Sequence, residues 1–136
     1  MKTEIFTGVY SSLDKIRTFF TKAAKEAGLG ERSQFDVQLA ADEAASNIID
    51  HAYCGEGKGD IECSYQIFDD KLVLIFKDFG EPFDPAGVEP PDTGSDVCRR
   101  KSRGLGLFFM SKLMDEIEFN FDADSGNILR MVKKKC

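Results

Sequence analysis

A carboxylate and a carboxamide lie four residues apart in the stretch Gln38–Tyr53, where Glu43 precedes Asn47. On a helix this spacing brings both side chains to one face, because residues i and i+4 are neighbours. Glu43 can then accept a proton, and the side-chain carbonyl of Asn47 can bind Mg²⁺. A solvated polar face would carry the same residues, and the stretch alone does not decide between the two interpretations.

The periodicity of this stretch predicts an amphipathic helix. At 100° per residue, Asp36 and Asp50 fall on the same side as Glu43 and Asn47. The opposite side is apolar and carries Ala41, Ala45, Ile48, Ile49 and Ala52. The segment Ser33-Gln-Phe-Asp36 has the form of a capping box with Asp in place of the usual Glu, so the helix is expected to begin there and run to about Tyr53.

A second candidate is the motif Asp78-Phe-Gly80, which comes just after a predicted strand. The Asp78 carboxylate can accept a hydrogen bond from an exocyclic amine such as that of adenine, and Gly80 lets a ligand approach the backbone. Asp-x-Gly is also a generic turn, so the motif alone leaves both interpretations open.

A third candidate is the segment Arg103-Gly-Leu-Gly106, which opens a predicted helix that ends near Met114. Small residues expose backbone N–H groups at the positive end of a helix, where phosphates bind. The alternative is a flexible hinge before a core helix.

Other patterns predict the elements that position these candidates. Thr3–Tyr10 has the composition of a strand, and apolar residues recur at helical spacing over Ser12–Ala27. Two hairpins are expected, one from Ile61–Phe68 with Leu72–Phe76 and one from Ile117–Phe121 with Ile128–Val132. This order predicts an α+β fold, in the form of a two-layer α/β sandwich.

A long loop separates the last two candidates. All four prolines lie between Phe79 and Arg103, together with several glycines. A loop of this length in a compact domain is usually functional, and we expect a lid over about residues 83–103.

The composition indicates one soluble domain over residues 1–136, without an apolar run near the ~18 residues that a membrane span needs. With 18 basic and 24 acidic residues the net charge is −6, which argues against direct binding to nucleic acid. The four cysteines form no Cys-x-x-Cys pair, so free thiols in a reducing cytoplasm are expected. The final Lys133, Lys134 and Lys135 are expected to form a solvated tail.

Together, these pieces resemble the Bergerat-fold (GHKL) ATPases, the superfamily of gyrase, heat-shock chaperones, histidine kinases and MutL. Within it the chain is similar to the small bacterial anti-sigma factors that are also serine protein kinases, and the similarity covers nearly the whole sequence. The matching segments are Glu43 to Asn47, Asp50-His-Ala-Tyr53, Asp78-Phe-Gly-Glu-Pro-Phe-Asp-Pro85, Arg103-Gly-Leu-Gly-Leu107 and Met114-Asp-Glu116.

The resemblance implies a mixed, mainly antiparallel sheet covered on one face by about three helices. It implies that ATP is held between the lid and the predicted helix that carries Glu43 and Asn47. It assigns Glu43 as the general base, Asn47 as the Mg²⁺ ligand, and Asp78 with Gly80 to adenine. It assigns the phosphates to Arg103, Gly104, Leu105 and Gly106.

The implied function is an anti-sigma factor with ATP-dependent serine/threonine protein kinase activity. It would sequester a sigma factor and phosphorylate an anti-sigma factor antagonist, as a homodimer in the cytoplasm. Phosphoryl transfer asks little covalent chemistry of a protein, so positioning, one Mg²⁺, phosphate donors and a base can suffice. The alternative is an ATP-binding regulatory module without kinase activity that controls another partner protein.

Overall fold

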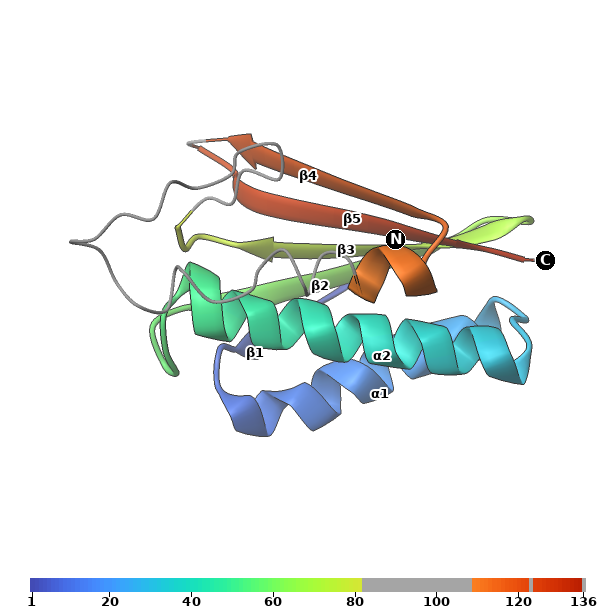
Figure 1. Ribbon diagram of the computed structural model, residues 1–136, viewed down its shortest axis with the longest axis horizontal. Helices are drawn as coiled ribbons and strands as arrows, with labels where there is room; N and C mark the ends of the chain where they lie inside the picture. The colour runs from blue at the N-terminus through green and yellow to red at the C-terminus, as the bar shows by residue number, and fades with distance from the viewer. Residues whose placement is uncertain (82–108, 123, 136) are drawn as a thin grey trace.

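The computed structural model describes residues 1–81, 109–122 and 124–135, and in these it forms a five-stranded sheet with helices on one face (Figure 1). In chain order the elements are β1 (Lys2–Thr7), α1 (Leu13–Glu26), α2 (Glu31–Asn47), β2 (Asp60–Ile67), β3 (Lys71–Asp78), β4 (Glu116–Asp122) and β5 (Gly126–Lys134). Residues 109–113 are also helical. The predicted α+β sandwich is confirmed.

The sheet has the strand order β1-β2-β3-β5-β4, and each pair of neighbours is antiparallel. Both predicted hairpins are present, as β2 with β3 and β4 with β5. Because β5 lies beside β3, the closing hairpin brings its turn next to the end of β3, where Asp78 pairs with Asn127.

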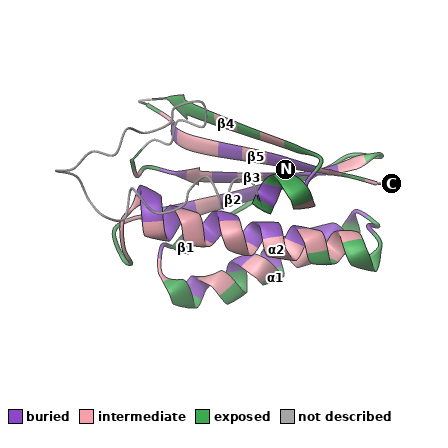
Figure 2. Cartoon of the chain, in the orientation of Figure 1, coloured by how far each residue is buried: buried purple, intermediate pink, exposed green. Residues whose placement is uncertain are grey.

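The core lies between the helices and one face of the sheet, as the buried faces of α1 and α2 in Figure 2 show. Phe20 of α1 is fully buried and packs on Phe76 of β3 with ring centroids 4.8 Å apart. Burying such a side chain contributes roughly 1.5–3 kcal/mol to stability. The contact between Phe20 and Phe76 therefore holds α1 against β3, the middle strand of the sheet. Helix α2 lies beside α1 on the same face.

The start of α2 differs from the prediction. The helix begins at Glu31 with Gly30 as its N-cap, and no side chain caps it. Gly30 is extended, and its carbonyl accepts the first helical hydrogen bond, from Gln34 N at 2.9 Å. The predicted capping box at Ser33 is wrong, because Ser33 already lies inside the first turn.

The end of α2 also differs. After Asn47 the chain forms the π-helical segment η2 (Ile48–Ala52), in which Tyr53 N donates to Ile48 O at 2.9 Å. A π-helix needs more residues per turn than an α-helix. The expected α-helical spacing therefore holds up to Asn47 and fails for Asp50.

The predicted solvated tail is wrong for Lys133 and Lys134, which lie in β5, although the Lys134 side chain stays exposed. Lys133 lies in β5 with its side chain 14% exposed, and its Nζ is 3.1 Å from Asp36 Oδ2. The same Nζ donates to Leu113 O at 2.6 Å, at the end of the helical residues 109–113. Lys133 therefore ties β5 to α2 and to that short helix.

The cysteines differ in state. Cys63 on β2 is a free, fully buried thiol, whereas Cys54, just after η2, is disulfide-bonded. The expectation of free thiols is therefore wrong for Cys54.

Among the helices that the structure describes, none has the length and the apolar character to span a bilayer.

Candidate functional site

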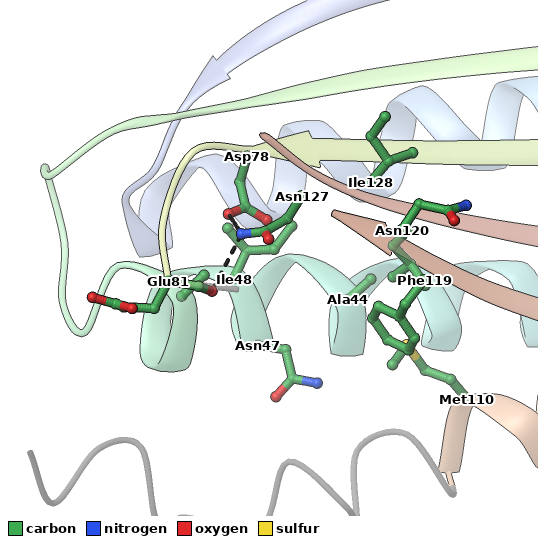
Figure 3. Close-up of a pocket in the computed structure, with 12 residues that line it drawn as sticks. Ala44, Asn47, Ile48, Asp78, Glu81, Met110, Phe119, Asn120, Asn127 and Ile128 are labelled. Atoms are coloured by element: carbon green, nitrogen blue, oxygen red, sulfur yellow. Dashed lines mark hydrogen bonds between the residues drawn. The ribbon is translucent and has the colours of Figure 1, made fainter. Parts of the chain in front are cut away.

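A pocket of about 520 Å³, part of it open to solvent, lies between α2 and the ends of β3, β4 and β5 (Figure 3). Its apolar walls include Ala44, Ile48, Met110, Phe119 and Leu129, and its polar lining residues are Asn47, Asp78, Glu81, Asn120 and Asn127.

Asp78 is the last residue of β3 and is 4% exposed. A carboxylate is costly to bury unless hydrogen bonds replace its water. Here Oδ1 accepts hydrogen bonds from Gly80 N and from Asn127 Nδ2, both at 2.8 Å. The carboxylate is thus held in a fixed orientation at the wall of the pocket.

Asn127 was not among the predicted site residues. It lies on β5 directly opposite Asp78, and its Nδ2 also donates to Gly80 O at 3.1 Å and to Glu81 O at 3.2 Å. Figure 3 shows Asp78 and Asn127 pointing toward each other from neighbouring strands. The pairing register that brings them together depends on β5 lying beside β3, which the sequence pattern did not reveal.

Two glycines allow this close arrangement. A Cβ on Gly80 would lie 2.4 Å from Ala52 O, because the end of β3 packs directly on η2. Glu81 N donates to that same Ala52 carbonyl at 2.8 Å. Gly126, with φ +85°, turns the hairpin beside Asp78 in a conformation that favours glycine.

The Tyr53 hydroxyl makes hydrogen bonds beside the end of β3. It donates to Asp60 O at 2.7 Å and accepts from Phe79 N at 3.1 Å. Burial, together with the nearby carboxylates of Asp78 and Asp60, raises the pKa of Tyr53 and outweighs the hydrogen bond from Phe79, which lowers it. The hydroxyl therefore stays protonated and keeps η2 joined to β2 and β3.

Four polar residues, Asp36, Glu43, Asn47 and Asp50, were expected on one side of the same predicted helix. Of these four, Asn47 alone lines the pocket. Glu43 lies one turn earlier on α2 and is partly exposed, outside the lining. Asp36 is bound by Lys133, and Asp50 accepts a hydrogen bond from the Tyr10 hydroxyl. These two aspartates are thus engaged in contacts that hold α2 and η2 to other elements.

The predicted phosphate-binding residues Arg103, Gly104, Leu105 and Gly106 lie outside the described residues, as does the predicted lid over 83–103. The described helix that follows them contributes Met110 to the pocket wall.

The residues present fit an adenine nucleotide. Apolar side chains on both sides of the pocket suit a flat base, and the Asp78 carboxylate suits an amino group. The Asn127 Oδ1 atom is buried and has no hydrogen-bond partner among the described residues.

The described residues also fit Mg²⁺ carried by a nucleotide better than a metal held by protein alone. They contain no group of three His, Cys, Asp or Glu side chains arranged to hold an ion. Mg²⁺ is usually bound by one or two protein oxygens together with phosphates and water. Asn47 can supply such an oxygen.

Comparison with known proteins decides the family. The model of the histidine kinase-like ATPase domain matches residues 7–133. The chain belongs to this family. The predicted resemblance to the GHKL ATPases is thereby confirmed.

Curated relatives place this ATPase domain in the serine-protein kinase branch. A protein of Listeria monocytogenes named serine-protein kinase RsbW is 35% identical over 103 residues, covering 73% of this chain and 66% of the relative. One of Bacillus licheniformis with the same name is 31% identical over 122 residues, covering 87% and 75%. The chain thus spans about two thirds to three quarters of these two relatives.

Solved structures support the fold of this ATPase domain. The RsbU and RsbW domains of Rv1364c from Mycobacterium tuberculosis match with a TM-score of 0.64 at 13% identity, over 98% of this chain and 32% of that one. The catalytic domain of histidine kinase ThkA matches with a TM-score of 0.56 at 13% identity, over 99% and 98%.

Proposed function

We propose that this ATPase domain is a protein serine/threonine kinase that uses Mg-ATP and also acts as an anti-sigma factor. One observation carries the proposal: in a chain of this family, a buried carboxylate, Asp78, is held at the wall of a pocket that Asn47 borders from α2. The names of the relatives support the kinase assignment.

In this proposal Asp78 orients the adenine by accepting a hydrogen bond from its amino group, with Gly80 beside it. The apolar walls exclude water from the base, and the Asn47 side-chain oxygen holds Mg²⁺. Arg103, Gly104, Leu105 and Gly106 are proposed to bind the phosphates. Mg-ATP supplies the phosphoryl group that is transferred.

Glu43 is proposed as the general base that accepts the proton of the acceptor serine. Glu43 is partly exposed and lies one helical turn from Asn47 on α2, so a protein substrate can reach it. No tight substrate pocket is needed for this role, because the acceptor serine arrives on another protein.

The proposed partners are a sigma factor, which the domain sequesters, and an anti-sigma factor antagonist, which it phosphorylates. We further propose that it works in the cytoplasm as a homodimer. Phosphorylation of the antagonist would change the choice of partner, because a charged phosphate alters the affinity of one complex and leaves the other unchanged.

A second candidate function is an ATP-binding regulatory module without kinase activity. The observation that favours it is that Glu43 makes no part of the pocket lining. In that case nucleotide would act only as a conformational ligand, and the chain would control another partner protein.

The test compares Glu43→Ala with Asn47→Ala. The parent protein and each variant are mixed with Mg-ATP and the purified antagonist, and phosphoserine is measured by mass spectrometry. Nucleotide affinity is measured separately by calorimetry. Glu43→Ala should bind ATP normally and transfer the phosphoryl group roughly 10²–10⁴-fold more slowly, which is the usual contribution of a general base. Asn47→Ala should weaken Mg-ATP binding itself.

Transfer by Glu43→Ala at the parent rate would show that this carboxylate is not the base. A parent protein that binds ATP and both partners without any transfer would favour the regulatory module.

A further inference from the structure

The π-helical segment η2 (Ile48–Ala52) connects two polar residues of the pocket that come from different elements. It begins directly after Asn47, and the carbonyl of its last residue, Ala52, accepts the hydrogen bond from Glu81 N at 2.8 Å. Asn47 and Glu81 both line the pocket. A change in the winding of η2 would therefore alter the spacing between α2 and the end of β3.

The π-helical winding of η2 needs support from outside the segment. Its turn is closed by the hydrogen bond from Tyr53 N to Ile48 O at 2.9 Å, whereas an α-helix would pair Tyr53 N with Ile49 O. Turns of the π type are rare, mostly occur singly within α-helices, and are frequent at functional sites. Contacts with other elements must therefore stabilise this form over the common one.

Asp50, in the middle of η2, makes such a contact. Its carboxylate accepts a hydrogen bond from the hydroxyl of Tyr10, which lies on the 3₁₀ turn η1 (Tyr10–Ser12) before α1. In an α-helix, Asp50 would lie on the same face as Asn47, three residues earlier. The wider π turn instead directs the Asp50 side chain toward η1.

Tyr10 is itself fixed to the loop that follows η2. Its backbone N donates to Glu56 Oε1 at 2.6 Å, and nearby Gly8 N donates to Gly59 O at 2.9 Å. The hydrogen bond to Asp50 raises the pKa of the Tyr10 hydroxyl, so the hydroxyl remains a donor at neutral pH. The Tyr10 side chain is therefore held in place for this contact, although it is 47% exposed.

We propose that Tyr10 is a positioning residue of the nucleotide site. Its hydroxyl stabilises the π form of η2 through Asp50, and the π form keeps the Ala52 carbonyl within reach of Glu81 N. Neither Tyr10 nor Asp50 is among the described residues that line the pocket, so the pair acts on a nucleotide only through η2. The inference rests on the proposed ATP binding and adds a contact outside the pocket that controls nucleotide affinity.

Two measurements on variants of the pair test this role. Calorimetry gives the affinity for Mg-ATP, and NMR without nucleotide gives the hydrogen-exchange rates of the Tyr53 and Glu81 amides. Tyr10→Phe and Asp50→Ala should each weaken Mg-ATP binding by about three- to tenfold, the usual effect of losing one hydrogen bond. Both amides should exchange faster by a similar factor, because one closes the π turn and the other joins it to the end of β3.

Three further variants show whether the effect comes from this one hydrogen bond. Asp50→Asn keeps a side-chain oxygen that can accept from the Tyr10 hydroxyl, so it should retain affinity near that of the parent. The double variant Tyr10→Phe/Asp50→Ala should bind no more weakly than either single variant, since both break the same bond. Tyr65→Phe removes a hydroxyl that donates to Glu26 at the opposite end of α1, and it should change neither measurement. Melting temperatures show that each variant is folded.

A folded Tyr10→Phe protein that keeps the parent affinity for Mg-ATP would overturn this inference and leave the proposed function standing. The same holds for a Tyr10→Phe protein that loses affinity while both amides exchange at the parent rate, because η2 would then not carry the effect. A folded parent that binds no Mg-ATP would overturn the proposed function and the positioning role together.

Discussion

Lys133 shows how a residue expected in solvent becomes part of the structure. A run of lysines at the end of a chain is usually solvated. In β5, however, successive side chains point to opposite faces of the sheet, so Lys133 points toward α2 while the Lys134 side chain is 59% exposed. The aliphatic part of a lysine can be buried while its ammonium group reaches a polar partner. Here the partners are Asp36 and the Leu113 carbonyl.

Lys133→Met should lower the free energy of unfolding by about 1.5–3 kcal/mol, because the Asp36 carboxylate and the Leu113 carbonyl lose a charged donor. Urea denaturation followed by circular dichroism measures this change. Lys134→Met is the matched control, since its neighbouring carboxylate is 4.0 Å away at the surface, and it should change stability by no more than about 0.5 kcal/mol. Equal effects of the two substitutions would contradict the role given to Lys133.

At the scale of elements, the junction between β3 and η2 shapes the pocket. Glu81 N donates to Ala52 O at 2.8 Å, and Gly80 lies against the same peptide. This contact is possible because Gly80 has no side chain. It sets where Asp78 lies relative to α2 and so defines the width of the pocket.

Gly80→Ala should be destabilising by roughly 1–3 kcal/mol, because the new methyl group would overlap backbone atoms that cannot move without shifting η2. Thermal unfolding measures the loss. Gly30→Ala provides a contrast, since no atom lies within 4 Å of a Cβ at that position. A Gly80→Ala protein as stable as the parent would mean that β3 and η2 are free to separate.

The sequence predicted the strands and helices well, because their apolar periodicity is local. It also identified Asp78 and Asn47 as candidates through residue type and spacing. Asn127 escaped prediction because its role depends on the pairing of β3 with β5, two strands far apart in sequence. The π-helical turn escaped as well, since nothing in Ile48–Ala52 distinguishes it locally from an α-helix.

At the scale of the whole molecule, one buried thiol links stability to pH. Burial, and then the carboxylates of Glu4 and Glu62, raise the pKa of Cys63 well above its ordinary value of 9.0. The folded state keeps this proton where the unfolded chain releases it. The unfolded state therefore binds fewer protons at high pH, and stability falls as the pH rises through about 9.

This fall should amount to about 1.4 kcal/mol for each pH unit above the ordinary thiol pKa. Urea midpoints measured between pH 8 and pH 10, taken relative to the Cys63→Ala variant, isolate the contribution of the thiol. The parent should lose stability more steeply than Cys63→Ala. Parallel curves would show that Cys63 ionises equally well in both states.

The central claim is that the pocket between α2 and the sheet binds an adenine nucleotide through Asp78, and calorimetry with Mg-ATP tests it most directly. Asp78→Asn keeps the size of the side chain and allows a donor in place of an acceptor, opposite the adenine amino group. It should weaken ATP binding by about 1–3 kcal/mol, or roughly five- to 150-fold, while the melting temperature shows that the variant is folded. Unchanged affinity for ATP in a folded Asp78→Asn protein would contradict the account.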